Sequence, residues 1–477
     1  MASQRLEERV RLFCAATLIA ALMSSCGGSS GGSTPSSLSA GGNGSGGTVG
    51  SGGSGTTASG SCDTNRVLWG GNTGGAGAPS SISRFTNTGY MTNPRASHTA
   101  TLLSDGKVLV VNGGQVDIDD LLVSIVSAEI FDPSVGKFTP ARAPCVAREF
   151  HSATLLKTGE VLITGGNEFS GYPTWLRSTT TAELYDPATG KFAKTGNMAV
   201  GRTYHTATLL ADGRVLVVGG SPPAATAAEI YDPATSMFSA TANMPTVRAG
   251  HTATILPSGE VLIIGGQNDE GTLATAELYD AKTNTFTATG SMAAPRTGHT
   301  ATLLANGKVL VAGGAPSKAL VTGGIDISAS PQVTAELYDP LTGLFVATAS
   351  MSAGRIGHTA TLLPDGTVLI AGGFQDYSSG RGYESYNSAE IYDPVTASFS
   401  ATDPMNTARF WHAATILRDG RVLFTGGIGA DLALASAEIY APLKPTDVVA
   451  VFDANSVDDG EGVTMTGSAD AVRHPVR

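Results

Sequence analysis

The stretch GRTYHTATLLADGRVLVVGG, residues 201–220, decides the fold, because close copies of it recur along most of the chain. Each copy runs from Arg-x-x-His through a Thr-rich apolar segment and an Asp-Gly-like turn to a second apolar segment and Gly-Gly. A variable loop, the motif Ala-Glu-x-Tyr-Asp-Pro and a Phe one turn later complete the unit. Apolar runs joined by such tight turns predict β-hairpins, so we expect four short strands in each unit.

Seven of the eight histidines of the chain occupy the same position in this unit. They are His98, His151, His205, His251, His299, His358 and His412. Their spacing of 46 to 59 residues is typical of the blades of a β-propeller. The almost continuous apolar character of the two inner strands indicates that neighbouring blades cover both faces.

The repeated Gly-Gly and Ala-Glu-x-Tyr-Asp-Pro motifs resemble kelch repeats, and the resemblance covers residues 66–443. We place the Gly-Gly pairs at 113–114, 165–166, 219–220, 265–266, 313–314, 372–373 and 426–427. The resemblance implies an all-β, seven-bladed kelch-type propeller, the architecture of the central domain of galactose oxidase and of many binding proteins without catalysis. The fold alone therefore does not decide the function.

The last unit ends near Leu443 without a fourth strand. Residues 85–91, FTNTGYM, match the fourth-strand segment FAKTGNM of residues 192–198 in spacing and character. We expect this N-terminal strand to complete the seventh blade, which would close the ring and remove two free sheet edges.

Residues 1–26 have the pattern of a signal peptide, with Arg residues before an apolar run that is too short to be a permanent membrane span. The run ends in LMSSC, which resembles a bacterial lipobox, so we expect lipidation at Cys26. Gly27 favours the outer membrane by the same resemblance. A plain cleaved signal, giving a periplasmic or secreted protein, and an uncleaved anchor are the alternatives.

Residues 27–61 consist almost entirely of Gly, Ser, Thr and Asn, and this composition predicts a disordered tether. Residues 444–477 carry no repeat and stay unassigned as a C-terminal tail. Cys62 and Cys145 are the two cysteines beyond the lipobox. In an oxidising compartment they could form a disulfide, and two free buried thiols are the alternative.

The formal net charge of −11 and the isoelectric point near 5.2 argue against nucleic acid or an anionic membrane surface as the partner, because both require basic patches. We expect a monomer that contacts a membrane only through its lipid anchor. The partner would be a protein or a glycan.

Every unit carries an Arg three residues before the His and a Glu that opens the third strand, as in Arg202, His205 and Glu229. We interpret Arg and Glu as a buried structural ion pair, because an unpaired buried Arg is costly. A cationic ring for an anionic ligand is the alternative. We expect the His to bond a backbone carbonyl, since seven ligands spread around a ring cannot reach one metal ion.

Tyr204 and His205 have the form of the Tyr-His copper ligands of galactose oxidase and its relatives. The other parts of that copper-radical site are not recognisable: a second metal-binding Tyr, a second His outside the repeat position and a suitably placed Cys. Motifs of other catalytic classes are absent from the sequence as well. We therefore expect no cofactor, with a copper-radical oxidase and a structural surface component as alternatives to a binding scaffold.

The loops after each Gly-Gly hold all of the length variation, and variable loops on a rigid scaffold are the usual place for binding. Two of these loops and the start of the last blade are rich in aromatic residues. The candidate binding residues are Phe169, Tyr172, Trp175, Arg177, Phe374, Tyr377, Arg381, Tyr383, Tyr386 and Trp411. Their alternative role is to cap the blades against one another. Asp117, Asp119 and Asp120 form an acidic loop that we interpret as solvated rather than calcium-binding.

Overall fold

The computed structural model describes residues 83–116, 122–168, 177–221, 227–316, 330–375, 384–430 and 432–442. The chain divides into two units, Met1–Ala441 and Pro442–Arg477, and every strand described below belongs to the first. None of the described residues forms a helix long and apolar enough to cross a membrane. The predicted signal peptide, tether and tail lie outside these ranges.

Each repeat folds into a four-stranded antiparallel sheet, and the described ranges contain seven such sheets, numbered here as blades in chain order. Blade 1 contains β2 (Thr99–Leu102), β3 (Val108–Val111), β6 (Ala128–Asp132) and β7 (Lys137–Ala141). Blade 2 contains β8 (Ser152–Leu155), β9 (Val161–Thr164), β12 (Ala182–Asp186) and β13 (Lys191–Lys194). Blade 3 contains β14 (Thr206–Leu209), β15 (Val215–Val218), β16 (Ala228–Asp232) and β17 (Met237–Ala240).

The remaining blades have the same strand order. Blade 4 contains β18 (Thr252–Ile255), β19 (Val261–Ile264), β20 (Ala276–Asp280) and β21 (Thr285–Ala288). Blade 5 contains β22 (Thr300–Leu303), β23 (Val309–Ala312), β24 (Ala335–Asp339) and β25 (Leu344–Ala347). Blade 6 contains β26 (Thr359–Leu362), β27 (Val368–Ala371), β30 (Ala389–Asp393) and β31 (Ser398–Thr402). Blade 7 contains β32 (Ala413–Ile416), β33 (Val422–Thr425), β34 (Ala437–Tyr440) and β1 (Phe85–Asn87).

Three of the variable loops begin and end as short hairpins. These are β4 (Gly114–Val116) with β5 (Leu122–Ser124), β10 (Asn167–Glu168) with β11 (Arg177–Ser178), and β28 (Phe374–Gln375) with β29 (Glu384–Ser385). They follow the second strands of blades 1, 2 and 6.

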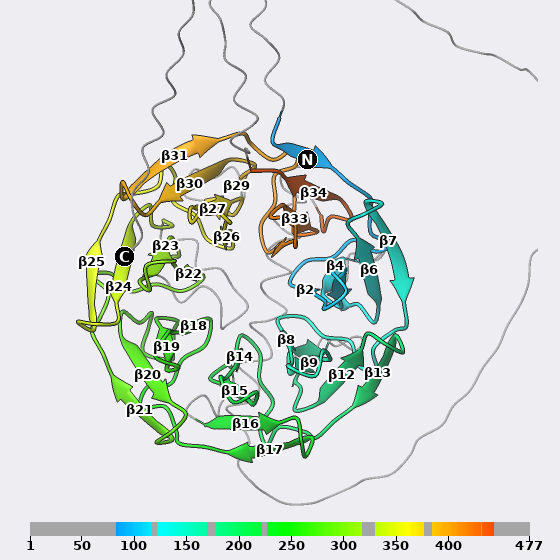
Figure 1. Cartoon of the computed structure of the whole chain (residues 1–477), viewed down its shortest axis with the longest axis horizontal. Coiled ribbons are helices and arrows are strands. Elements are labelled where there is room, and N and C mark those ends of the chain that lie inside the picture. Colours follow the sequence, from blue (N-terminus) through cyan, green and yellow to red (C-terminus); the bar gives the residue numbers. More distant parts are fainter. Residues whose placement is uncertain are drawn as a thin grey trace, which may run out of the picture. The chain divides into compact units, whose positions relative to one another are not determined.

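The seven sheets form a ring with the first strand of each blade at the centre (Figure 1). Each innermost strand contacts the innermost strands of the two neighbouring blades, and β32 of the last blade contacts β2 of the first. The sequence prediction of a seven-bladed propeller is confirmed.

The ring is closed by the N-terminal strand, as predicted. β1 pairs antiparallel with β34 in the register Phe85 to Tyr440, so blade 7 takes three strands from one end of the propeller and one from the other. In Figure 1 the blue β1 lies along the outer side of the orange-red β34. The Phe85 ring is 2% exposed, and its centroid lies 4.9 Å from that of Tyr440.

The hydrophobic core lies between the blades. Every residue of the second strands is buried, because each strand faces a neighbouring blade on both sides. One cluster, for example, joins Leu216 and Ile230 of blade 3 to Val261 and Tyr279 of blade 4. Each fully buried side chain of the size of Leu, Ile or Val contributes about 1.5–3 kcal/mol to the free energy of folding. Neighbouring blades therefore stabilise one another.

The Gly-Gly register of the first blade differs from the prediction. The two positive φ angles that Gly219 and Gly220 adopt in blade 3 belong to Asn112 (φ 54°) and Gly113 (φ 107°) in blade 1. Asn is among the residues that tolerate the left-handed region, so it can replace the first Gly. Gly114, which we had included in the pair, lies one residue further along and matches Phe374 of blade 6.

Candidate binding site

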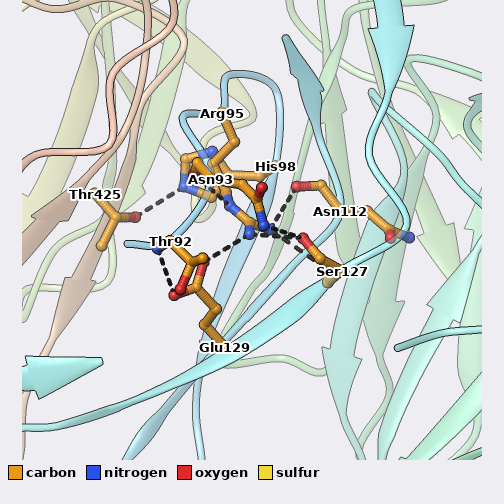
Figure 2. Close-up of polar contacts among 8 residues, drawn as sticks. All are labelled: Thr92, Asn93, Arg95, His98, Asn112, Ser127, Glu129 and Thr425. Atoms are coloured by element: carbon orange, nitrogen blue, oxygen red, sulfur yellow. Dashed lines mark hydrogen bonds and ion pairs between the residues drawn. The ribbon is translucent and has the colours of Figure 1, made fainter. Parts of the chain in front are cut away.

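The Arg of each Arg-x-x-His loop forms a buried ion pair with the Glu of its own blade. The N–O distances are 2.7–2.9 Å. In blade 1, Arg95 also donates to the backbone carbonyl of Asn112 and to Ser127 Oγ (Figure 2). The seven pairs are Arg95–Glu129, Arg148–Glu183, Arg202–Glu229, Arg248–Glu277, Arg296–Glu336, Arg355–Glu390 and Arg409–Glu438.

The same glutamates join neighbouring blades. Glu129 accepts a hydrogen bond from the backbone N–H of Thr92, which follows strand β1 of blade 7 (Figure 2). Glu229 accepts one from Ala199, after the fourth strand of blade 2, and the other five glutamates have matching partners. The arginines are at most 1% exposed, so they do not offer a cationic ring to an anionic ligand.

Each repeated histidine connects its blade to the preceding one through a threonine hydroxyl. Nε2 of the histidine lies 2.8–3.0 Å from the threonine Oγ1, where the sequence led us to expect a backbone carbonyl as partner. The pairs are His98–Thr425, His151–Thr99, His205–Thr164, His251–Thr206, His299–Thr252, His358–Thr300 and His412–Thr359.

Burial keeps the histidines neutral. Desolvation is the largest cause that lowers the pKa of His151, His205, His299 and His358 to about 3, and the nearby arginines lower it further. The same causes lower the pKa of the other three histidines well below the usual value. A neutral imidazole matches a hydroxyl partner, because it can donate or accept one hydrogen bond at Nε2.

The two residues of the copper-site alternative make other contacts in the structure. His205 is 6% exposed, and its Nε2 lies 2.9 Å from Thr164 Oγ1. The ring of Tyr204 faces Phe150, with 4.3 Å between the centroids. Within the described ranges, no three His, Cys, Asp or Glu side chains come together in a group that could hold a metal ion.

The residue just before each histidine adopts a positive φ of 49–66°. Glycine fills this position in blades 4, 5 and 6, and glycine reaches this region without strain. The other four blades place Ser97, Phe150, Tyr204 and Trp411 there. A positive φ is a genuine outlier for a bulky residue, and such strain is concentrated at functional sites.

Backbone hydrogen bonds join these positions from blade to blade around the centre of the ring. Trp411 donates to Gly357, Ser97 to Trp411, and Phe150 to Ser97. Tyr204 then donates to Phe150, and Gly250 to Tyr204, over distances of 2.9–3.3 Å. These bonds join six of the seven positions into an arc around the axis, at the end of the propeller where the innermost strands begin.

Phe150, Tyr204 and Trp411 form what we call the aromatic crescent, since each of them is half-buried and at least one ring contact links it to another. The Phe150 centroid lies 4.3 Å from that of Tyr204 and 5.8 Å, edge to face, from that of Trp411. Phe374 and Phe410 support Trp411 from beneath within a buried cluster. Blades 4, 5 and 6 have glycines at the same position, so the aromatic residues at this position come only from blades 2, 3 and 7.

Only part of the predicted binding surface lies in the described ranges. Trp411 belongs to the crescent, whereas Phe374 is 1% exposed and has the capping role that was its alternative. Tyr386 is half-buried and donates to Gln375 Oε1, and the backbone of Arg177 lies in β11. Phe169, Tyr172, Trp175, Tyr377, Arg381 and Tyr383 lie outside the described residues, as do Asp117, Asp119 and Asp120.

Cys145 is an exposed free thiol, where the alternative to the disulfide predicted a buried one. Cys62 and the predicted lipidation site Cys26 both lie outside the described residues.

Neither Phe150 nor the position before each histidine was predicted from the sequence as part of a site. A signal was present: three of seven copies have Gly there, which indicates a positive φ, and the aromatic copies depart from that requirement. The contacts among Phe150, Tyr204 and Trp411 could not be predicted from the sequence, because they depend on which blades are neighbours in the ring.

No protein-family model matches the chain, and no curated protein matches it. Among solved structures, the chain is similar to one described as a novel fungal alcohol oxidase of the AA5 family in complex with copper. The TM-score is 0.59 with 18% identity over 75% of each chain. The protein YjhT gives a TM-score of 0.49 with 16% identity, over 66% of this chain and 99% of that one. At 18% identity the likeness to the alcohol oxidase concerns the fold alone. Together with the seven repeated sheets it supports a seven-bladed β-propeller, built from repeats that resemble kelch units.

Proposed function

We propose that the chain is a non-catalytic kelch propeller that binds a protein or a glycan on the loop-bearing face, with the aromatic crescent as the centre of the binding site. The observation that carries the proposal is the positive φ of Phe150, Tyr204 and Trp411, at positions where glycine would be unstrained. Large aromatic side chains supply contact area at little conformational cost, and they dominate the energetics of many binding sites.

The proposal includes export and a lipid anchor. Cys26 would carry the lipid, and residues 27–61 would serve as the tether that presents the propeller outside the cytoplasm. The acidic character of the chain supports a partner other than nucleic acid. Mass analysis of the mature N-terminus tests this part, because an unmodified Cys26 would contradict it.

The test of the binding site replaces Phe150, Tyr204 or Trp411 by glycine, the residue that blades 4, 5 and 6 already have at this position. We expect each variant to fold with an unfolding free energy within about 2 kcal/mol of the parent, since relief of backbone strain of about 1–3 kcal/mol offsets the lost ring contacts. Binding on a glycan array or to a captured protein partner should fall at least tenfold. Unchanged binding by all three variants would contradict the proposal.

A matched control places a change at the same position on the other side of the axis. Gly298→Ala introduces a side chain at a φ of 64°, so it should lower stability by about 1 kcal/mol or more and leave binding intact. A copper-radical oxidase is tested separately by copper content and by hydrogen peroxide release with sugar or alcohol substrates. Stoichiometric copper together with peroxide release would replace the binding proposal.

A further inference from the structure

A buried carboxyl group that has no partner among the described residues adjoins the aromatic crescent in the sequence. Glu149 precedes Phe150 in the Arg-x-x-His loop of blade 2 and is 3% exposed. Its Oε2 atom lies against Gly114 of blade 1, where a Cβ would collide with it. The other six blades place uncharged residues at this position: Ala96, Thr203, Ala249, Thr297, Ile356 and Phe410.

No described residue donates a hydrogen bond to the Glu149 side chain or forms an ion pair with it. Burial alone raises its pKa to about 8. The nearest arginines are engaged elsewhere, Arg148 with Glu183 and Arg95 with Glu129. A buried, unpaired carboxyl destabilises the fold, so its presence points to a ligand that pairs with it.

Two hydroxyl groups in the adjacent blades are also without partners. Ser97 Oγ of blade 1 and Thr203 Oγ1 of blade 3 are buried, and neither has a hydrogen-bond partner within the part of the chain that the structure describes. Ser97 lies between Trp411 and Phe150 in the backbone ring, and Thr203 precedes Tyr204. Unsatisfied polar groups thus occur in three consecutive blades, all beside the crescent.

The charges around this site favour a cation. The seven loop arginines are neutralised by their glutamates, and the seven histidines are neutral. The chain carries a net charge of −11. Aromatic faces attract organic cations, and aromatic sites beside a carboxylate are a recurring way to bind ammonium groups.

We propose that the aromatic crescent and Glu149 bind the ammonium head of a small organic cation, such as a primary amine or a quaternary ammonium group. The cation would lie on the rings of Phe150, Tyr204 and Trp411, with Glu149 as its counter-ion. This inference rests on the proposed function, because it names the chemistry of the same binding site.

Binding of a cation must favour the ionised form of Glu149, so a proton leaves the protein when the ligand arrives near pH 7. The loops around Glu149 also carry Arg148 and His151 of its own blade, Arg95 and His98 of blade 1, and Glu168 of β10, and burial is the one cause of its pKa shift. The arginines stay charged, and the histidines, already neutral, have no proton to release at this pH. Affinity should therefore increase with pH up to about 8.

The experiment compares choline with its uncharged carbon isostere by isothermal titration calorimetry on the purified protein at pH 7, in two buffers of different ionisation enthalpy. We expect choline to bind at least tenfold more tightly than the isostere and to release close to one proton. Glu149→Gln should reduce choline affinity at least tenfold and abolish proton release. Glu168 is an exposed carboxylate in the same blade, so Glu168→Gln should change neither the choline affinity nor the proton release.

Equal binding of choline and the isostere, no binding of choline, or proton release that persists in Glu149→Gln would overturn the inference. Cosedimentation with phosphatidylcholine vesicles, measured beside free choline, shows whether the head group is recognised on a lipid. If crescent glycine variants lose a glycan or protein ligand while choline does not bind, the proposed function stands and the cation fails. If neither ligand depends on the crescent, both proposals fail.

Discussion

At the residue scale, the residues that depart from the repeat at an otherwise repeated position indicate where function lies. The residue before each histidine has a positive φ in every blade, and glycine is the unstrained choice. Phe150, Tyr204 and Trp411 keep that φ at a cost of about 1–3 kcal/mol each. The repeated Arg pairs with the Glu of its own blade, and the repeated His and Glu bond to the preceding blade. Residues that break the repeat are therefore better candidates for function than those that make it.

The buried histidines predict a steep loss of stability in acid. In the folded protein the pKa of His151, His205, His299 and His358 is about 3, and burial lowers the pKa of the other three well below the usual value. The unfolded value is about 6.5, so the unfolded state binds more protons below pH 6.5. Their contribution is fully present above pH 6.5 and is lost as the pH falls toward 3, by up to about 1.4 kcal/mol per pH unit for each histidine. Urea unfolding between pH 7 and pH 4 measures this slope.

His299→Gln should reduce that slope by about one proton, since the variant removes one group that titrates only on unfolding. His474→Gln, at the histidine outside the repeats, is the control and should leave the slope unchanged. A slope that is the same in all three proteins would show that the histidines do not control acid unfolding.

At the scale of the strands, the threonine that binds each histidine has two alternative positions. Five blades place it at the first residue of the innermost strand, such as Thr99, which pairs with Val111. Blades 2 and 7 have Ser152 and Ala413 there and place the threonine on the paired residue of the second strand. A threonine hydroxyl is therefore present between the blades in every case, but either the first or the second strand can supply it.

This exchange can be tested in blade 7. Thr425→Val leaves Nε2 of His98 buried without its partner and should lower the free energy of unfolding by about 1–3 kcal/mol. Adding Ala413→Thr rebuilds the arrangement of the other blades on the paired residue and should restore most of the loss. Chemical denaturation of the parent, the single variant and the double variant measures the coupling, and a double variant no more stable than Thr425→Val would contradict it.

At the scale of the propeller, the seven sheets are held as a ring by one short strand. β1 covers the edge of β34, and without it blade 7 would expose an unpaired strand. One core cluster joins blade 7 to blade 6 and another joins it to blade 1, so a loss of order in blade 7 removes support from both neighbours.

Phe85→Ala should therefore destabilise the whole propeller. The variant removes a buried ring that contacts Tyr440 and Phe424, with an expected cost of about 3–5 kcal/mol. Tyr90→Ala lies in the same segment, and its side chain is 68% exposed, so it should change stability by less than about 0.5 kcal/mol. Differential scanning calorimetry would contradict the closure argument if the two variants melted alike.

Much of this fold could be predicted because the repeat is local. A blade is defined by two apolar runs, a tight turn and the spacing between them within one unit. Seven copies of that unit define the ring. The Arg and Glu pairing also followed from the cost of burying a lone charge. The register of Asn112–Gly113 was predicted wrongly, because Asn and Gly both adopt a left-handed φ and the sequence does not show which residues do so.

The amino-acid sequence by itself determined the architecture and the closing strand, since strand period, turn residues and repeat number are properties of neighbouring residues. Tertiary structure alone decided which parts of different repeats meet. It brought Phe150, Tyr204 and Trp411 together from blades 2, 3 and 7, and it placed Glu149 against Gly114 with no partner among the described residues. The physical reason is ring closure, which makes the first and last blades neighbours and gives seven similar loops unequal surroundings.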